Sequence, residues 1–344
     1  LSHHIILSNL DACRMVFQPN RTDCICGVLP FFHSFGYTAT LWFPLLSGLS
    51  TVYCPNPLDS SKVGEAAGKR KATLLFATPA FLLNYARRVR EKDFEHLRIV
   101  VTGAEKLPHR IAKLFDDKFG ITPLEGYGAT ELSPIATLNI PDVELAGVKQ
   151  TGTLSGTVGH PLPGVAVQVI DPDTLEPLPV GARGLLLIKG PNVMLGYLNN
   201  PAKTAEVIKD GWYNTGDIAS LNKSGFITIH DRLSRFSKIA GEMIPHLAIE
   251  NELKRGVESV ENNLIVTAVP DVKRGEKLIV LFTDAAGNAN SLQQTMTASD
   301  IPNLWKPLPS SYYKVDAIPM LGSGKVDLKG VKNLALHRVG EEGS

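Results

Sequence analysis

A hexapeptide with the sequence GYGATE combines residue types that suit binding of a phosphorylated ligand: Gly126, Tyr127, Gly128, Thr130 and Glu131. The glycines allow the backbone to approach a ligand closely, and the tyrosine offers a flat face for a purine. The threonine can hydrogen-bond a phosphate, and the glutamate can hold one side of a Mg²⁺ ion that otherwise keeps water and phosphate oxygens. Taken alone, the segment is equally typical of a glycine-rich turn capped by a threonine.

A second segment, residues 212–217, ends in Asp217 after a Thr-Gly turn. An ionised carboxylate only accepts hydrogen bonds, so this residue suits two vicinal ribose hydroxyls. A turn-forming aspartate is the alternative interpretation, and the segment by itself does not decide between them.

Two further segments carry positive charge. Residues 231–245 contain Arg232, Arg235 and Lys238 and lead to Gly241, which can take a positive φ. Lys325 follows a Gly-Ser-Gly sequence, so it can reach over a site as a mobile point charge. A solvated basic strand at a domain edge and an exposed loop are the corresponding alternatives.

The elements that must position these residues alternate between strand and helix in the first part of the chain. Short apolar runs predict strands over residues 25–30, 51–54, 73–77 and 98–102, and helical patterns lie at 36–46, 61–71, 79–90 and 108–119. This alternation predicts a doubly wound parallel α/β sheet with helices on both faces. Its ligand should lie beyond the carboxyl ends of the strands, where Gly103 and residues 126–128 fall.

The pattern changes twice further along the chain. From about residue 152 to 229, short strands between Pro, Gly and Asn turns predict a small β-barrel or sheet, and a small α+β unit follows. We therefore expect three parts: a partial α/β subdomain (1–150), a β-rich subdomain (151–231) and a mobile α+β C-terminal domain (232–344).

Composition limits the function classes. The chain has 35 Lys+Arg against 34 Asp+Glu, is 44% hydrophobic, and contains no uninterrupted apolar run of membrane-spanning length. These values exclude intrinsic disorder and argue against a nucleic-acid partner bound by bulk electrostatics. Four cysteines without a CxxC pair favour buried reduced thiols and a cytoplasmic location.

Seven ordered segments together carry a family resemblance: residues 29–36, 126–131, 156–164, 184–197, 213–217, 231–241 and 324–325. In these segments the chain resembles the acyl-adenylate-forming (AMP-binding) superfamily, which includes acyl-CoA synthetases, firefly luciferase and nonribosomal-peptide adenylation domains. Residues 33–38, 41–46, 103–107 and 231–239 look most like one branch. That branch is the acyl-(acyl-carrier-protein) synthetase half of bifunctional 2-acylglycerophosphoethanolamine acyltransferase.

The resemblance implies two half-reactions. A carboxylate attacks the α-phosphate of ATP to form an acyl-adenylate and pyrophosphate, and a pantetheine thiol then displaces AMP. The resemblance implies that Tyr127 lines the adenine, with Gly126 and Gly128 beside the nucleotide, and that Gly103 and Ala104 form a backbone wall for the nucleotide and the acyl chain. It implies that Asp217 and Arg232 bind the ribose, that Thr130 contacts phosphate and that Glu131 ligates Mg²⁺. His33 would border the acyl-carboxylate and thiol region, and Lys325 would stabilise the charge that develops between the carboxylate and the α-phosphate. A buried structural histidine is the alternative for His33.

The same resemblance implies that the C-terminal domain rotates between the half-reactions about a hinge at Ser234, exchanging Lys325 for the loop at Gly241. The expected substrates are a fatty acid and either acyl carrier protein or coenzyme A. An acidic carrier protein favours a basic rim, for which the chain offers six residues that an ordinary charged surface explains equally well: Arg235, Lys238, Lys254, Arg255, Lys273 and Arg274.

Two departures from the family pattern modify these expectations. The phosphate loop that ends in a lysine should lie just before Leu1, so we expect an N-terminally truncated fragment that binds AMP weakly and does not adenylate at a normal rate. Apolar surface exposed by truncation favours a homodimer or a need for the remainder. Asp231 replaces the family's usual glycine but agrees with the named branch.

Three other functions remain to be weighed. An acyl-CoA ligase differs only in the thiol acceptor, and a non-catalytic nucleotide-binding scaffold predicts decayed motifs, which this chain does not have. A nonribosomal-peptide adenylation domain requires an aspartate for the amino-acid ammonium, and no convincing equivalent is present. The named branch further implies lysophospholipid reacylation at the cytoplasmic face of the inner membrane, without a transmembrane segment in this chain.

Overall fold

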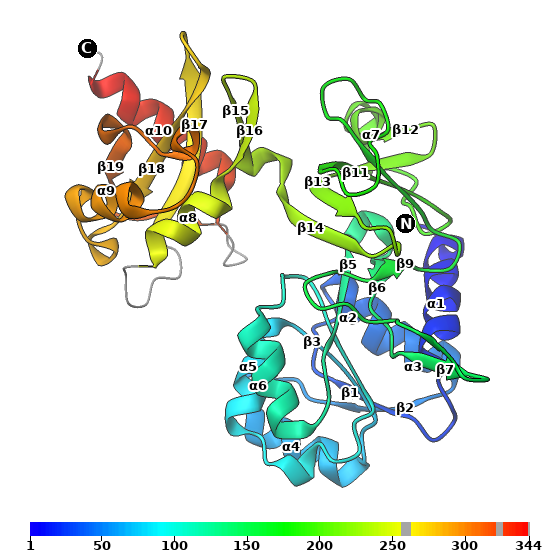
Figure 1. The fold of residues 1–344 in the computed structure, drawn as a ribbon. Coiled ribbons are helices and arrows are strands. Elements are labelled where there is room, and N and C mark those ends of the chain that lie inside the picture. The colour runs from blue at the N-terminus through cyan, green and yellow to red at the C-terminus, as the bar shows by residue number, and fades with distance from the viewer. Residues whose placement is uncertain (256–262, 321–325, 343–344) are drawn as a thin grey trace. The chain divides into compact units, whose positions relative to one another are not determined.

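The computed structural model describes residues 1–255, 263–320 and 326–342. The chain forms two compact units, Leu1–His230 and Asp231–Ser344, coloured blue to green and yellow to red in Figure 1. The structure thus divides the chain one residue before the position expected from the sequence. The further division near residue 150 stays a prediction.

The first unit is built on a seven-stranded sheet in the order β2-β1-β3-β4-β5-β6-β9. Strands β2 to β5 are parallel, whereas β6 and β9 pair antiparallel. Three of the parallel strands, β1, β3 and β4, are buried at every position, as expected for strands covered on both faces. The bounds are β1 Cys24–Gly27, β2 Ser50–Tyr53, β3 Leu74–Ala77, β4 Ile99–Thr102, β5 Leu124–Gly128, β6 Ile135–Leu138 and β9 His160–Pro161.

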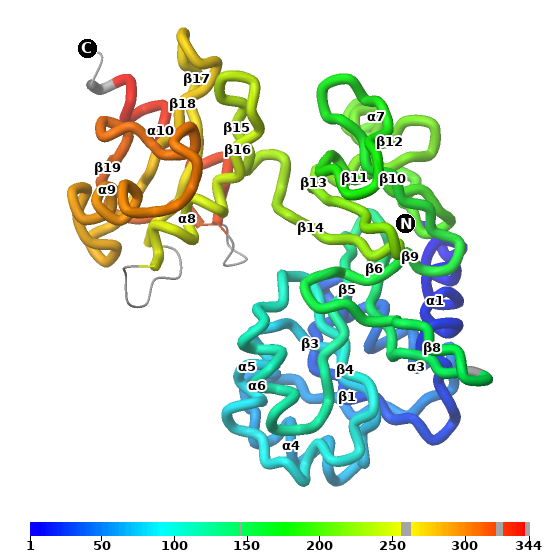
Figure 2. Tube along the Cα trace, in the orientation of Figure 1, coloured from blue at the N-terminus to red at the C-terminus, as the bar shows by residue number. Residues whose placement is uncertain are grey.

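Helices cover both faces of this sheet, because alternate strand residues point to opposite sides. Leu74 and Phe76 join one apolar cluster with α1, and Leu75 and Ala77 join a second cluster with α4, α5 and α6. Figure 2 shows α1 on one side and the three other helices on the other. This confirms the predicted doubly wound α/β class, although α1 was not predicted. The helices are α1 His3–Phe17, α2 Ser34–Gly36, α3 Phe43–Ser47, α4 Ser60–Arg70, α5 Pro79–Arg88 and α6 His109–Phe119.

The β-rich part of the first unit is an antiparallel sheet in the order β10-β11-β13-β12, with β14 paired to β13. Its apolar cluster includes Leu186 and Ala219 from this sheet together with Leu132 and Ala136 from the segment that follows β5. The two sheets therefore share a core next to the GYGATE segment. The bounds are β7 Val143–Leu145, β8 Val148–Gln150, β10 Ala166–Ile170, β11 Gly184–Lys189, α7 Pro201–Val207, β12 Ile208–Lys209, β13 Trp212–Leu221 and β14 Ile227–Arg232.

The second unit packs helices against both faces of the sheet β17-β18-β19, beside the hairpin β15-β16. Strand residues again alternate: Val266 and Val280 face one cluster with α8 and α9, whereas Ile265 and Ile279 face the other with α10. The bounds are β15 Phe236–Ile239, β16 Glu242–Pro245, α8 His246–Lys254, β17 Leu264–Asp271, β18 Gly275–Phe282, α9 Ala289–Ala298, β19 Tyr312–Lys314 and α10 Leu328–Glu342.

Candidate functional site

Loops from the carboxyl ends of the parallel strands carry most of the predicted site residues. His33 lies in the loop after β1, Gly103 and Ala104 follow β4, and the GYGATE segment forms the end of β5 and a 3₁₀ turn at Thr130–Leu132. The Oγ of Ser34 lies 3.0 Å from the Oγ1 of Thr130, so the β1 and β5 loops meet through their hydroxyls. This is the edge of the sheet where α/β proteins place their ligands.

The loop after β4 adopts a backbone that its sequence does not favour. Ala104 has φ 70°, in the left-handed region that costs a non-glycine residue energy and is enriched at functional sites. The amide of Leu107 donates to Oε1 of Glu125 on β5 at 2.9 Å, which anchors the end of this loop. Burial raises the pKa of Glu125 although that amide and Lys106 oppose the shift.

Tyr127 and Asp217 are joined directly. The phenol hydroxyl of Tyr127 donates a hydrogen bond to Oδ2 of Asp217, which is 4% exposed on β13. The Asp217 amide donates to Oγ1 of Thr215 at 3.0 Å, so both the backbone and the carboxylate are held. The structure therefore brings together two residues that the sequence assigned separately to base and ribose.

Glu131 has a tyrosine partner of its own. Tyr197 donates through its hydroxyl to Oε1 of Glu131 at 2.8 Å, and the amide of Met194 donates to the carbonyl of Glu131 at 2.8 Å. Tyr127 and Tyr197 both pack against the apolar cluster shared by the two sheets. One core thus supports both carboxylates of the candidate site.

Gly128 has a packing reason that the sequence did not indicate. A Cβ at this position would lie 1.9 Å from the carbonyl oxygen of Pro134, just before β6. Likewise, a Cβ at Gly126 would lie 3.1 Å from the carbonyl oxygen of Thr137. The missing side chains leave room for the neighbouring strand, so close strand packing by itself requires glycine at Gly128.

His33 is exposed at the start of α2, and this contradicts the alternative of a buried structural histidine. Its Nδ1 accepts from the amide of Phe35 at 3.2 Å, so the ring caps the helix. In the neutral ring this leaves the proton on Nε2.

The chemistry of the donors fits Mg²⁺ bound mainly by phosphate. In the part of the chain that the structure describes, no group of three or more His, Cys, Asp or Glu side chains could hold a metal by itself. Mg²⁺ commonly uses one or two carboxylates together with phosphate oxygens and water. Glu131, with one oxygen already occupied by Tyr197, matches that limited requirement.

The remaining predicted residues belong to the second unit. Arg232 is exposed and its amide donates to Oδ1 of Asp231 at 2.8 Å, and Ser234 lies exposed in a 3₁₀ turn. Gly241 has φ 87° in the turn between β15 and β16, as predicted for a residue with a positive φ. Lys325 lies outside the described residues.

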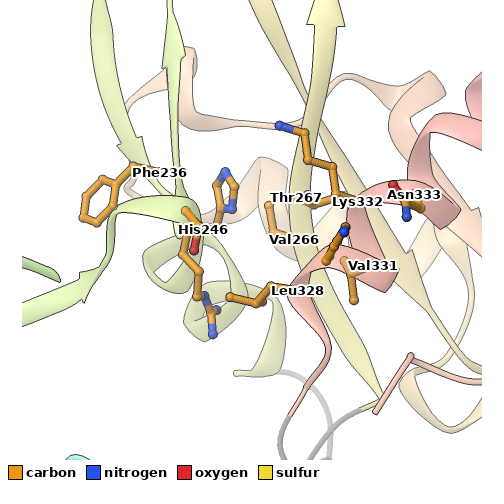
Figure 3. A pocket seen from close by; sticks show the side chains of 11 residues that line it. Phe236, His246, Val266, Thr267, Leu328, Val331, Lys332 and Asn333 are labelled. Carbon is orange, nitrogen blue, oxygen red and sulfur yellow. The ribbon is translucent and has the colours of Figure 1, made fainter. Parts of the chain in front are cut away.

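A cavity of about 440 Å³ adjoins the predicted hinge inside this unit (Figure 3). Ser234 and Arg235 line it together with His246 and the first turns of α10. Arg235 is paired with Glu250 at 2.7 Å, and Oγ of Ser237 lies 2.6 Å from Nε2 of His246. Burial, with Arg235 and Lys332 nearby, lowers the pKa of His246 to about 3.

Sequence reasoning missed the partners of the site residues. Ser34 and Tyr197 lie inside segments that were already singled out, but their contacts are 96 and 66 residues away in sequence. The local sequence showed only that each of these segments contains a residue with a hydroxyl group, and it did not show which distant residue that hydroxyl contacts.

An α/β protein with glycine-rich loops and held carboxylates at this sheet edge is of the class that binds nucleotides. A family model described as AMP-binding enzyme matches residues 1–198, and the chain belongs to this family. Curated relatives include a probable 4-coumarate–CoA ligase 2 of Dictyostelium discoideum, 30% identical over 341 residues, covering 97% of this chain and 60% of the relative. A long-chain-fatty-acid–CoA ligase of Bacillus subtilis is 28% identical, covering 95% of this chain and 57% of that protein.

Solved structures agree with the fold. ATP-bound MatB from Rhodopseudomonas palustris superposes with a TM-score of 0.79 at 25% identity, covering 97% of this chain and 64% of that one. The chain thus spans about 60% of the length of the curated relatives it matches. Among the described residues, no helix has the length and apolar character that crossing a membrane requires.

Proposed function

We propose that the protein activates a carboxylic acid with ATP through an acyl-adenylate and passes the acyl group to a pantetheine thiol. The observation that carries this proposal is the pair of tyrosine-held carboxylates, Asp217 and Glu131, at the carboxyl edge of the parallel sheet. The CoA ligases among the relatives support the same type of reaction.

Each residue at this edge has a chemical task in the proposal. Asp217 accepts hydrogen bonds from the ribose hydroxyls, and the hydroxyl of Tyr127 orients its carboxylate while the ring lies beside the base. The loop at Gly103 and Ala104 forms the opposite wall, and Thr130 donates to a phosphate. Arg232 assists at the ribose. Glu131 holds Mg²⁺, which offsets negative charge on the phosphates.

The acid is bound beyond the nucleotide, next to His33. In the proposal the imidazole of His33, exposed at the start of α2, borders the acyl carboxylate and the incoming thiol. Lys325 stabilises the charge that develops between the carboxylate and the α-phosphate. We propose a fatty acid as substrate, in agreement with the long-chain-fatty-acid–CoA ligase among the relatives.

We propose acyl carrier protein as the acceptor, on the basis of charge in the second unit. Of the six basic residues considered above, three are paired with nearby acids: Arg235 and Lys254 with Glu250, and Arg255 with Glu252. The other three are exposed on two hairpins joined by the bond from the Ala240 amide to the Arg274 carbonyl at 3.1 Å: Lys238 lies in strand β15, and Lys273 and Arg274 lie in the turn between β17 and β18. An acidic carrier protein fits this surface.

Coenzyme A is the alternative acceptor, and it is favoured by the CoA ligases among the relatives. The two candidate acceptors can be distinguished by measuring the rate of thioester formation in the full-length protein, once with acyl carrier protein and once with coenzyme A. The double variant Lys273→Glu with Arg274→Glu should raise KM for carrier protein about tenfold and leave KM for coenzyme A unchanged. A faster reaction of the unmodified protein with coenzyme A would overturn the carrier-protein assignment.

The adenylation step itself is tested by pyrophosphate exchange in the full-length protein. Asp217→Ala and Glu131→Ala should each lower the exchange rate at least a hundredfold, because they remove the ribose acceptor and the cation ligand. Exchange at the normal rate in both variants would contradict the proposed function. We further propose, from the branch resemblance alone, that the acyl group is used for lysophospholipid reacylation at the cytoplasmic face of the inner membrane.

Exposed apolar side chains support self-association of the 344-residue chain. Phe31, Phe32 and Tyr53 are 45%, 93% and 47% exposed, close to the edge strand β2. We propose a homodimer through this surface, and sedimentation equilibrium measures it. A single monomeric species at all concentrations would contradict it.

A further inference from the structure

The Glu131 carboxylate is held from a distant part of the chain. Tyr197, 66 residues away in sequence, donates its hydroxyl proton to Oε1 at 2.8 Å. Three residues earlier, the amide of Met194 donates to the carbonyl of the same glutamate at 2.8 Å. One short segment therefore fixes both the backbone and the side chain of Glu131.

That segment is itself rigidly anchored. The amide of Tyr197 donates to Oγ1 of Thr204 at 2.9 Å, and the same hydroxyl donates to the carbonyl of Asn200 at 3.0 Å. Gly196 has φ 150°, and a Cβ there would lie 2.6 Å from the Thr204 side chain. Only glycine allows the chain to pass this close to α7, and the turn fixes the direction in which Tyr197 leaves the backbone.

A second tyrosine extends the arrangement. The side chain of Tyr213 on β13 interacts with that of Tyr197, and both rings belong to the shared apolar cluster. Asp217 lies four residues further along β13. The strand that carries the ribose carboxylate therefore also supports the phenol that holds Glu131.

We propose that Tyr197 is a positioning residue that fixes the Glu131 carboxylate for Mg²⁺ bound with the nucleotide phosphates. With Oε1 engaged by the phenol, the rotation of the carboxylate is restricted and its other oxygen is kept for the cation. This inference rests on the proposed function, because it assumes that Glu131 is the cation ligand.

The test is direct binding of Mn²⁺, as a paramagnetic probe for Mg²⁺, to the full-length protein with ATP. Electron paramagnetic resonance reports free Mn²⁺ independently of catalysis. Tyr197→Phe removes only the hydroxyl and should weaken Mn²⁺ binding about tenfold. Affinity for AMP in the absence of metal should change less than twofold, since the ribose contacts do not involve Tyr197.

Two further variants separate positioning from loss of packing. Tyr85→Phe is the matched control, because its hydroxyl also donates one hydrogen bond, to the carbonyl of Pro57 at 2.9 Å, within the same unit. It should leave both affinities unchanged. In a Glu131→Gln background, Tyr197→Phe should have no additional effect on Mn²⁺ binding, because the two residues act as one unit.

The outcomes distinguish failure of the positioning role of Tyr197 from failure of the proposed function. Unchanged Mn²⁺ binding in Tyr197→Phe, or an equal additional loss in the Glu131→Gln background, would overturn the positioning role and leave the proposed function standing. Absence of nucleotide-dependent Mn²⁺ binding in the unmodified protein would overturn both.

Discussion

The hydroxyl of Tyr127 donates to Oδ2 of Asp217 and so connects the last parallel strand of one sheet to the central strand of the other. The two residues are 90 positions apart in sequence. A phenol donating to a carboxylate forms a charge-assisted hydrogen bond, stronger than one between neutral groups. The pair therefore restricts the orientation of the carboxylate and also ties the two sheets together.

This relationship predicts a graded response to substitution at Tyr127. Tyr127→Phe retains the ring but removes the donor, so the Asp217 carboxylate must be immobilised when AMP binds. Ordering one side chain costs about 1.5 kcal/mol or less, so AMP affinity should fall by up to about tenfold. Tyr127→Ala should cost more, because the ring is also lost. Isothermal titration with AMP measures both, and equal affinities in Tyr127→Phe and the unmodified protein would contradict the orienting role.

Lys325→Ala should abolish adenylate formation in the full-length protein and spare thioester formation from preformed acyl-adenylate. The lysine charge is needed only where charge develops at the α-phosphate. Lys329→Ala, an exposed lysine four residues later, serves as the control. The two half-reactions are followed by pyrophosphate exchange and thioester yield, and equal loss of both would count against this role.

His246 should make the second unit sensitive to acid. Its pKa is about 3 in the folded protein, lowered by burial and by Arg235 and Lys332, against about 6.5 when unfolded. Between these values the unfolded state binds a proton that the folded state does not, so stability falls as pH falls through that window, by up to about 5 kcal/mol. His246→Asn should flatten this dependence.

Urea denaturation at several pH values between 7 and about 4 measures the slope. His109→Asn, a substitution of an exposed histidine, is the matched control and should retain it. Identical pH profiles for the unmodified protein and His246→Asn would show that this ring does not contribute.

Local pattern was sufficient for much of the fold. The runs that form β3 and β4 are apolar except for the final Thr102, and the helix after Pro108 ends at Gly120, which takes φ 67°. Burial on both faces and a left-handed helix end each leave a signature within a few residues. Helix α1 was missed.

The candidate site likewise has some residues that the sequence indicated and some contacts that it did not. Glu131 and Asp217 were singled out from short motifs, because a carboxylate after a glycine turn is unusual enough to notice. Their roles toward a ligand stay predictions. The glycines beside Tyr127 were assigned to ligand approach, but at Gly128 the carbonyl of Pro134 occupies the space.

The sequence by itself determined which segments carry charge, hydroxyls and glycine turns, and the order in which strands and helices alternate, since these depend on neighbours along the chain. Only the tertiary structure decided that Tyr127 meets Asp217, that Tyr197 meets Glu131, and that Ser34 meets Thr130. Contacts between residues 66 to 96 positions apart depend on how two sheets share one core, and no local pattern encodes that arrangement.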